Sequence, residues 1–127
     1  MVEADTGLTP DSFFSNWHHL AFTEKVGGGK AATASDPVKH LVKVFLNGAE
    51  ILSSDEYPDI ADFPAMKSLA FGAYADMSQE FVDLNVANDH YHGYLDEVAI
   101  FNVAKTGAEI TAMYKGKLNT GDPSLLM

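Results

Sequence analysis

Residues 39–52 read KHLVKVFLNGAEIL, and this stretch decides the fold class. Side chains alternate along its first half as they do on a strand, which places one set on a common face: His40, Val42, Val44 and Leu46. Asn47 and Gly48 tolerate the positive φ angles of a type I′ turn, and residues 50–52 return along a second strand. The sequence therefore predicts an antiparallel hairpin.

Further strands are predicted on either side of this hairpin. Their patterns lie at residues 17–23 (WHHLAFT), 67–74 and 90–102. The intervening residues 26–36, 53–65 and 76–89 are rich in glycine or acidic residues and predict loops. Residues 1–16 are expected to form an irregular lead-in and residues 117–127 an irregular tail. Residues 17–116 form the domain between them.

One short helix is predicted near the C-terminal end. Thr106 and Glu109 have the spacing of a capping box, in which each side chain bonds to the backbone amide of the other. Ile110 and Tyr114 then share a face, and Gly116 is a suitable stop. A helix this short depends on packing against a sheet.

The composition excludes several classes of function. The chain has 127 residues, which suits a single domain, and its net charge is -10, with Lys as the only basic residue type apart from His. Binding to nucleic acid or to an anionic membrane is not expected from such a charge. No apolar run approaches the roughly 20 residues of a membrane span, and the first residues lack a signal-peptide pattern. The chain has no Cys, so disulfides and thiolate chemistry are absent.

Five motifs in order resemble one known group of domains. They are WHHLAFT (17–23), VFLNG (44–48), LAFG (69–72), GYLDEVAIFN (93–102) and the helix residues Glu109, Ile110 and Tyr114. The set resembles the laminin G-like branch of the concanavalin A-like lectin/glucanase superfamily, to which pentraxins also belong. The resemblance implies an all-β jelly-roll sandwich of two antiparallel sheets with one short helix near the C-terminal end.

The resemblance also implies that part of the sandwich is missing. Such domains carry a block of strands before the WHH strand, and no similar block precedes residue 17. We expect an incomplete sandwich, completed by a missing N-terminal half or by strands of a partner chain. A native reduced form is the alternative.

Asp96 is the first candidate ligand for a metal ion. Strand alternation predicts that it shares a face with Val98 and Ile100, and an inward carboxylate needs a partner. The family often holds a structural calcium near the sandwich rim, and calcium prefers oxygen ligands. The expected set is completed by nearby oxygen-bearing side chains: Asp89, Asn88 and Asp76. The alternative is that Asp96 only caps backbone amides of a neighbouring turn.

The histidines and tyrosines are weaker candidates. His90 and His92 have the spacing of paired zinc ligands on a strand, but no third ligand is fixed by spacing, and solvated histidines are the simpler interpretation. His18 and His19 point to opposite faces and are interpreted as framework residues. Four tyrosines could stack on sugar rings, Tyr57, Tyr74, Tyr91 and Tyr94, and the first three are taken as the candidate binding residues. The alternative is that these rings are half-buried in the sheet.

Catalysis is not expected. Glycoside hydrolases of this superfamily alternate acidic residues along one strand as Glu-x-Asp-x-x-Glu, and this string does not occur. The sequence instead predicts a recognition or adhesion module, extracellular or at the cell surface, that binds a glycan or a protein. The alternatives are an ancillary domain of a carbohydrate-active or proteolytic enzyme, and a structural spacer in an adhesin.

Overall fold

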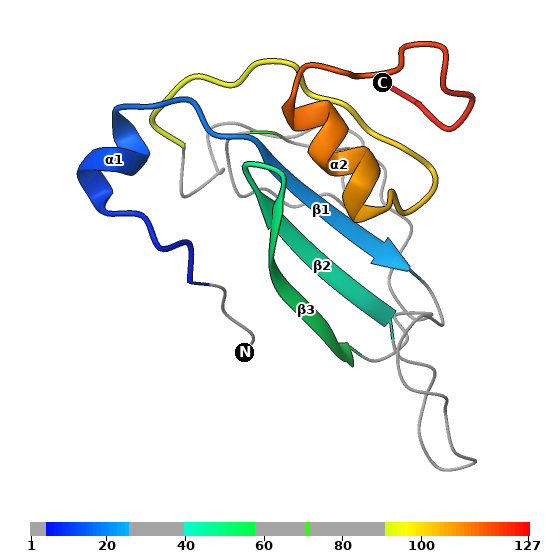
Figure 1. The fold of residues 1–127 in the computed structure, drawn as a ribbon, viewed down its shortest axis with the longest axis horizontal. Helices are drawn as coiled ribbons and strands as arrows, with labels where there is room; N and C mark the ends of the chain where they lie inside the picture. The colour runs from blue at the N-terminus through cyan, green and yellow to red at the C-terminus, as the bar shows by residue number, and fades with distance from the viewer. Residues whose placement is uncertain (1–4, 26–39, 58–70, 72–90) are drawn as a thin grey trace, which may run out of the picture. The chain divides into compact units, whose positions relative to one another are not determined.

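A computed structural model describes residues 5–25, 40–57, 71 and 91–127. Its elements follow the order α1 (Pro10–Phe14), β1 (Leu20–Lys25), β2 (His40–Leu46), β3 (Ala49–Tyr57) and α2 (Gly107–Tyr114) (Figure 1). The chain divides into two units. One comprises Met1–Asp59 and Ala99–Met127 and contains all five elements, and the other comprises Ile60–Val98.

The three strands form one antiparallel sheet in the order β1-β2-β3. Leu20 pairs with Leu46 and Phe22 with Val44, so β1 runs along one edge of β2. On the other edge, the hairpin turn has φ angles of 51° at Asn47 and 80° at Gly48. The predicted hairpin and the positive φ angles of its turn are confirmed.

Strand β3 is longer than its sequence pattern indicates. The prediction placed a loop from residue 53, whereas pairing continues through Val42 with Ser54 and His40 with Tyr57. The register shifts twice along this pair, as it does at a β-bulge. The backbone bonds of the neighbouring strand thus extend β3 through residues of low strand propensity.

Helix α2 covers one face of the sheet near the hairpin turn (Figure 1). The most buried apolar side chains are Phe45, at 2% exposure, and Ile110, at 1%. A Cβ built on Gly107 would lie 3.5 Å from the Phe45 ring, so the first turn of the helix lies close to this ring. Thr111 Oγ1 donates to the Gly48 carbonyl oxygen at 2.8 Å and joins the helix to the turn.

The predicted capping of α2 is confirmed at both ends. Thr106 N donates to Glu109 Oε2 at 2.7 Å, and Glu109 N donates to Thr106 Oγ1 at 3.3 Å. After the helix, Gly116 adopts φ of 74°, the left-handed conformation that glycine adopts readily.

The N-terminal lead-in contains a helix that was not predicted. Thr9 caps α1 by accepting from Ser12 N at 3.2 Å, and Pro10 occupies the first turn. The signal in the sequence is Thr-Pro-Asp-Ser, since Pro is favoured at the start of a helix and Thr before it. The lead-in was expected to be irregular with at most one short strand, and a five-residue helix is found instead.

The predicted strand at residues 90–102 is also wrong over most of its described length. Residues 91–100 have no strand, and Glu97 adopts φ of 51°, which interrupts an extended backbone. Phe101 instead forms a bridge with Leu125. The Ile100 carbonyl oxygen accepts from Leu126 N, and Asn102 N donates to the Ser124 carbonyl oxygen, so backbone bonds hold a tail that contains no helix or strand.

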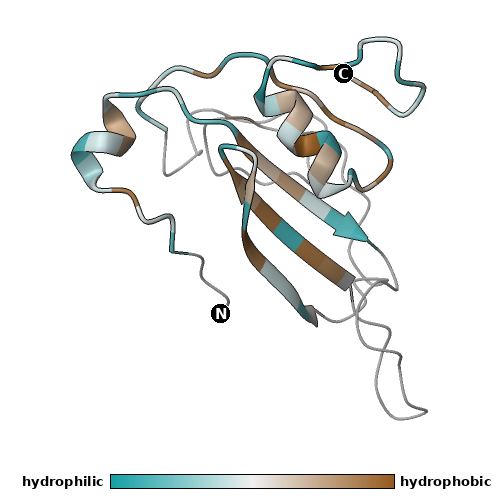
Figure 2. Ribbon diagram, viewed as in Figure 1, coloured by the Kyte–Doolittle hydropathy of each residue, from teal (hydrophilic) through white to brown (hydrophobic). Residues whose placement is uncertain are grey.

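The hydropathy of each strand follows its position in the sheet (Figure 2). The central strand β2 is the most continuously hydrophobic of the three, and the C-terminal end of β1 is hydrophilic. The described residues thus form a small three-stranded antiparallel sheet with two short helices. No helix among them is long and apolar enough to cross a membrane.

Candidate functional site

The expected calcium ligand Asp96 lies exposed rather than inward. Its Oδ1 accepts from Glu97 N at 2.8 Å, and Val98 beside it is also exposed. The predicted shared inward face is therefore wrong, because the positive φ at Glu97 breaks the alternation. The bond to Glu97 N matches the alternative in which Asp96 caps a neighbouring amide.

The other expected ligands, Asp89, Asn88 and Asp76, lie outside the described residues, as does His90. Within the part that the structure describes, no group of three or more His, Cys, Asp and Glu side chains is close enough to hold a metal ion. His92 is exposed. The structure therefore assembles no metal centre from the residues it describes.

Of the three candidate tyrosines, Tyr91 has a described side chain. Tyr74 lies outside the described residues, and Tyr57 is placed only by its backbone, at the end of β3. Tyr91 is exposed, and its ring lies over Gly93, where a Cβ would come within 2.6 Å of the Tyr91 hydroxyl oxygen. Gly93 thus permits a ring position that any larger residue would displace.

An exposed apolar stretch runs from α1 into β1, and no candidate from the sequence included it. Its members are large side chains that are more than half exposed: Phe14, Trp17, Leu20 and Phe22. Trp17 is 70% exposed and Phe22 67%. Leu20 and Phe22 share one face of β1, which is an edge strand among the described strands. The signal was present in the alternation of residues 19–23, which was used only to predict a strand.

Hydrogen bonds around Asn47 hold the start of this stretch in place. Asn47 Oδ1 accepts from His19 N at 3.0 Å, and Asn47 Nδ2 lies 3.1 Å from His18 Nδ1. His18 Nε2 lies 3.2 Å from the Ser12 carbonyl oxygen. We name this set, Asn47, His18, His19 and Ser12, the Asn47 clamp. It ties the hairpin turn to α1 and β1.

Both histidines contact neighbouring elements, although they precede β1 rather than lying on the strand predicted for residues 17–23. The His18 ring stacks on Phe13 with 5.4 Å between ring centroids and 8° between planes. The His19 ring lies 6.0 Å from that of Tyr114 on α2. His19 Nδ1 is buried without a hydrogen-bond partner, and burial lowers the pKa of this imidazole.

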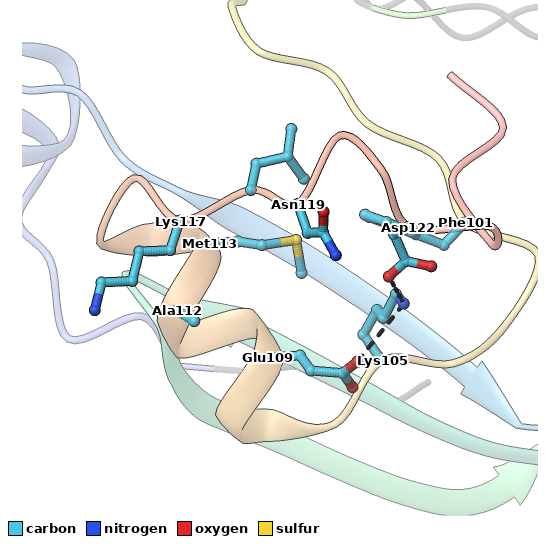
Figure 3. Close-up of a pocket in the computed structure, with 9 residues that line it drawn as sticks. Phe101, Lys105, Glu109, Ala112, Met113, Lys117, Asn119 and Asp122 are labelled. Carbon is cyan, nitrogen blue, oxygen red and sulfur yellow. Dashed lines mark hydrogen bonds and ion pairs between the residues drawn. The ribbon is translucent and has the colours of Figure 1, made fainter.

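A hollow of about 200 Å³ lies between α2 and the C-terminal segment (Figure 3). Lys105 lies at its wall with its side chain only 9% exposed, and its Nζ donates to Asp122 Oδ2 at 2.5 Å. The same Nζ lies 3.6 Å from Glu109 Oε1 and 4.7 Å from the centre of the Phe101 ring. The sequence signals were the four-residue spacing of Lys105 and Glu109 and the turn at residues 122–124.

The charges in this hollow stabilise one another. The hydrogen bond to Asp122 raises the pKa of Lys105. The bonds from Lys105 and Ser124 lower the pKa of Asp122 to about 2, and the Thr106 backbone amide lowers the pKa of Glu109. A lysine held protonated by two carboxylates is a poor nucleophile or base. The hollow is also smaller than the roughly 300–1,000 Å³ of typical ligand pockets. Its geometry suits a structural tie.

Comparison with known proteins adds no relative: no family model, no curated protein and no solved structure matches this chain.

Proposed function

We propose that this chain is a non-catalytic recognition module, extracellular or at the cell surface, that binds a glycan or a protein. One observation carries the proposal: the exposed apolar stretch, which presents Phe14 and Trp17 ahead of β1 on a held framework. Aromatic side chains of this size dominate the energetics of binding surfaces when they are buried by a partner.

The framework behind the stretch supports a binding role. The Asn47 clamp fixes the segment before β1, and β2 pairs with β1 along its length. A surface held in advance loses little conformational freedom when it binds. The titratable groups around Lys105 are engaged with one another in a structural tie, which favours a recognition role for the chain over catalysis at that hollow.

The jelly-roll sandwich is part of the same proposal. Leu20 and Phe22 lie on a face of β1 that is exposed, and such a face is buried by a second sheet in a sandwich. A strand-completing partner chain, or strands outside this sequence, would cover Leu20 and Phe22 and leave Phe14 and Trp17, which precede β1, as the recognition surface. A structural calcium remains a proposal through Asp96, whose exposed carboxylate is accessible to an ion.

A glycan array tests the recognition proposal directly. Wild-type protein is compared with Trp17→Ala, with Tyr91→Ala at the tyrosine favoured by the sequence, and with Tyr94→Ala as a matched exposed aromatic, since Tyr94 is 84% exposed. Binding that is lost in Trp17→Ala and retained in the two tyrosine variants supports the exposed stretch. Loss in Tyr91→Ala alone transfers the site to that tyrosine, and an array with no binding removes the glycan half of the proposal.

Thermal unfolding in calcium and in EDTA tests the ion. A midpoint raised by calcium in wild type and unchanged in Asp96→Ala supports the calcium site. An equal midpoint in both solutions removes it.

A further inference from the structure

Asn47 and Gly48 have a chemical property beyond their role in the turn. In an Asn-Gly pair the glycine amide nitrogen can attack the asparagine side chain, because glycine has no side chain to obstruct the approach. The bond from Gly48 N to Asn47 Cγ forms, Gly48 N loses its proton, and the Cγ–Nδ2 bond breaks as ammonia leaves. Water then opens the succinimide ring at either carbonyl carbon, which leaves aspartate or isoaspartate.

The Asn47 clamp fixes the amide group that this reaction must rotate. Asn47 Oδ1 accepts from His19 N, so the other terminal atom is the NH₂ group, which only donates. His18 Nδ1 is therefore its acceptor, and the proton of the His18 ring lies on Nε2, which donates to the Ser12 carbonyl oxygen. Both ends of the amide are thus bonded to residues 18 and 19.

Gly48, which supplies the attacking nitrogen, is also held in place. Its carbonyl oxygen accepts from Thr111 Oγ1 at 2.8 Å, and a Cβ at this position would lie 3.0 Å from Tyr114 Cδ1. Attack by Gly48 N requires Cγ to approach it out of the amide plane. The clamp bonds must break before that geometry forms, since they hold the amide between the His19 backbone N–H and the His18 ring.

We propose that Asn47 is a deamidation site that the native fold protects, with His18 as the protecting side chain. Conversion to isoaspartate would insert one carbon into the main chain of a two-residue turn. The register of β2 and β3, and the contact of Gly48 with α2, depend on the length of that turn. The fraction of protein converted at residue 47 would therefore increase with the time that the clamp spends open.

Peptide mapping by mass spectrometry after incubation at mildly alkaline pH measures the conversion at residue 47. We expect native wild type to convert at least about tenfold more slowly than the same protein in urea. His18→Ala should raise the native rate roughly five- to tenfold, as expected for the loss of one hydrogen bond. His18→Gln, which keeps an acceptor, should restore part of the protection.

Two variants separate the clamp from general effects. His92→Ala makes the same replacement at an exposed histidine, and Lys105→Met weakens the fold at the C-terminal tie. Both should leave the native rate at Asn47 near that of wild type. Equal rates in native buffer and in urea overturn the proposal, and so does a folded His18→Ala protein that converts no faster than wild type. If circular dichroism shows His18→Ala unfolded, His18→Gln and the wild-type ratio decide.

Discussion

Phe45 and Phe22 lie on neighbouring strands in adjacent rows of the sheet, yet Phe45 is 2% exposed and Phe22 67%. Phe45 pairs with Ala21 on the face that α2 covers, and Phe22 pairs with Val44 on the opposite face. Phenylalanine therefore has two different roles on the two faces of this small sheet. The covered face stabilises the fold, whereas the open face of β1 is available for a partner.

The largest difference should come from truncating these two rings. Phe45→Ala removes a buried ring beside α2, and we expect a loss of about 3–5 kcal/mol in the free energy of unfolding. Phe22→Ala should lose less than about 1 kcal/mol, because its ring is already exposed. Urea unfolding of both variants measures the comparison. Equal losses would show that the open face is as important to the isolated fold as the covered one.

Gly48→Ala, on the face that α2 covers, should cause the next largest loss of stability. Its φ of 80° disfavours a side chain, and a Cβ would lie 3.3 Å from Thr111 Cα in the backbone of α2. We expect a loss of about 1–3 kcal/mol in urea unfolding. Gly7→Ala is the matched control, since Gly7 has φ of 66° and no atom within 4 Å of a built Cβ. If both variants lose the same stability, backbone strain alone explains the effect and the contact with α2 contributes nothing.

Thr106→Ala tests how much the N-terminal cap of α2, the helix that covers one face of the sheet, contributes to stability. The variant removes the acceptor for Glu109 N, and we expect a loss of about 1 kcal/mol. Thr9→Ala makes the same change at α1, which has no buried residues, and should alter global stability less. Thermal unfolding followed by circular dichroism compares them. The reverse ranking would assign α1 a larger structural role than its exposure indicates.

The ion pair between Lys105 and Asp122 should make the stability of the fold depend on pH. The folded pKa of Asp122 is about 2, below its ordinary 3.8, so its contribution is present above roughly pH 4 and is lost as pH falls toward 2. Asp122→Asn should flatten the stability curve in that window. An unchanged curve would mean that the tie does not differ between the folded and unfolded chain.

The titration of His19 should have the smallest effect on stability, in a higher pH range than that of Asp122. Burial holds its folded pKa below 6.5, so the unfolded chain binds the proton first, and stability falls as pH decreases below about 6.5. His19→Gln should reduce the slope of the unfolding midpoint against pH in this range. A midpoint that rises on acidification would show that the imidazole gains a partner when charged.

Local sequence patterns predicted the features that depend on neighbouring residues. Asn47-Gly48 fixes its own turn, and Thr106 caps α2 through Glu109, three residues away. Strand β3 was shortened in the prediction because its later residues are held by β2 rather than by their own propensity. The strand expected around Asp96 failed because alternation of side chains does not reveal a positive φ at Glu97.

The candidate site was harder to predict for the same reason. Alternating apolar residues in β1 indicate a face, but they do not say whether another element covers it. The Lys105 tie joins residues 17 positions apart, and the clamp joins residues 28 and 29 positions apart. Such contacts follow from the packing of elements, which a pattern of neighbours does not contain.

The pairing of the last residues has a practical consequence for anyone who handles this protein. The Met127 carbonyl oxygen accepts from Ile100 N at 2.7 Å, so hydrogen bonding reaches the final residue of the sequence. A purification tag fused after residue 127 would start directly at a paired position, and a variant that lacks Leu126 and Met127 would lose their bonds to Ile100. A tag placed ahead of residue 5 leaves these bonds untouched.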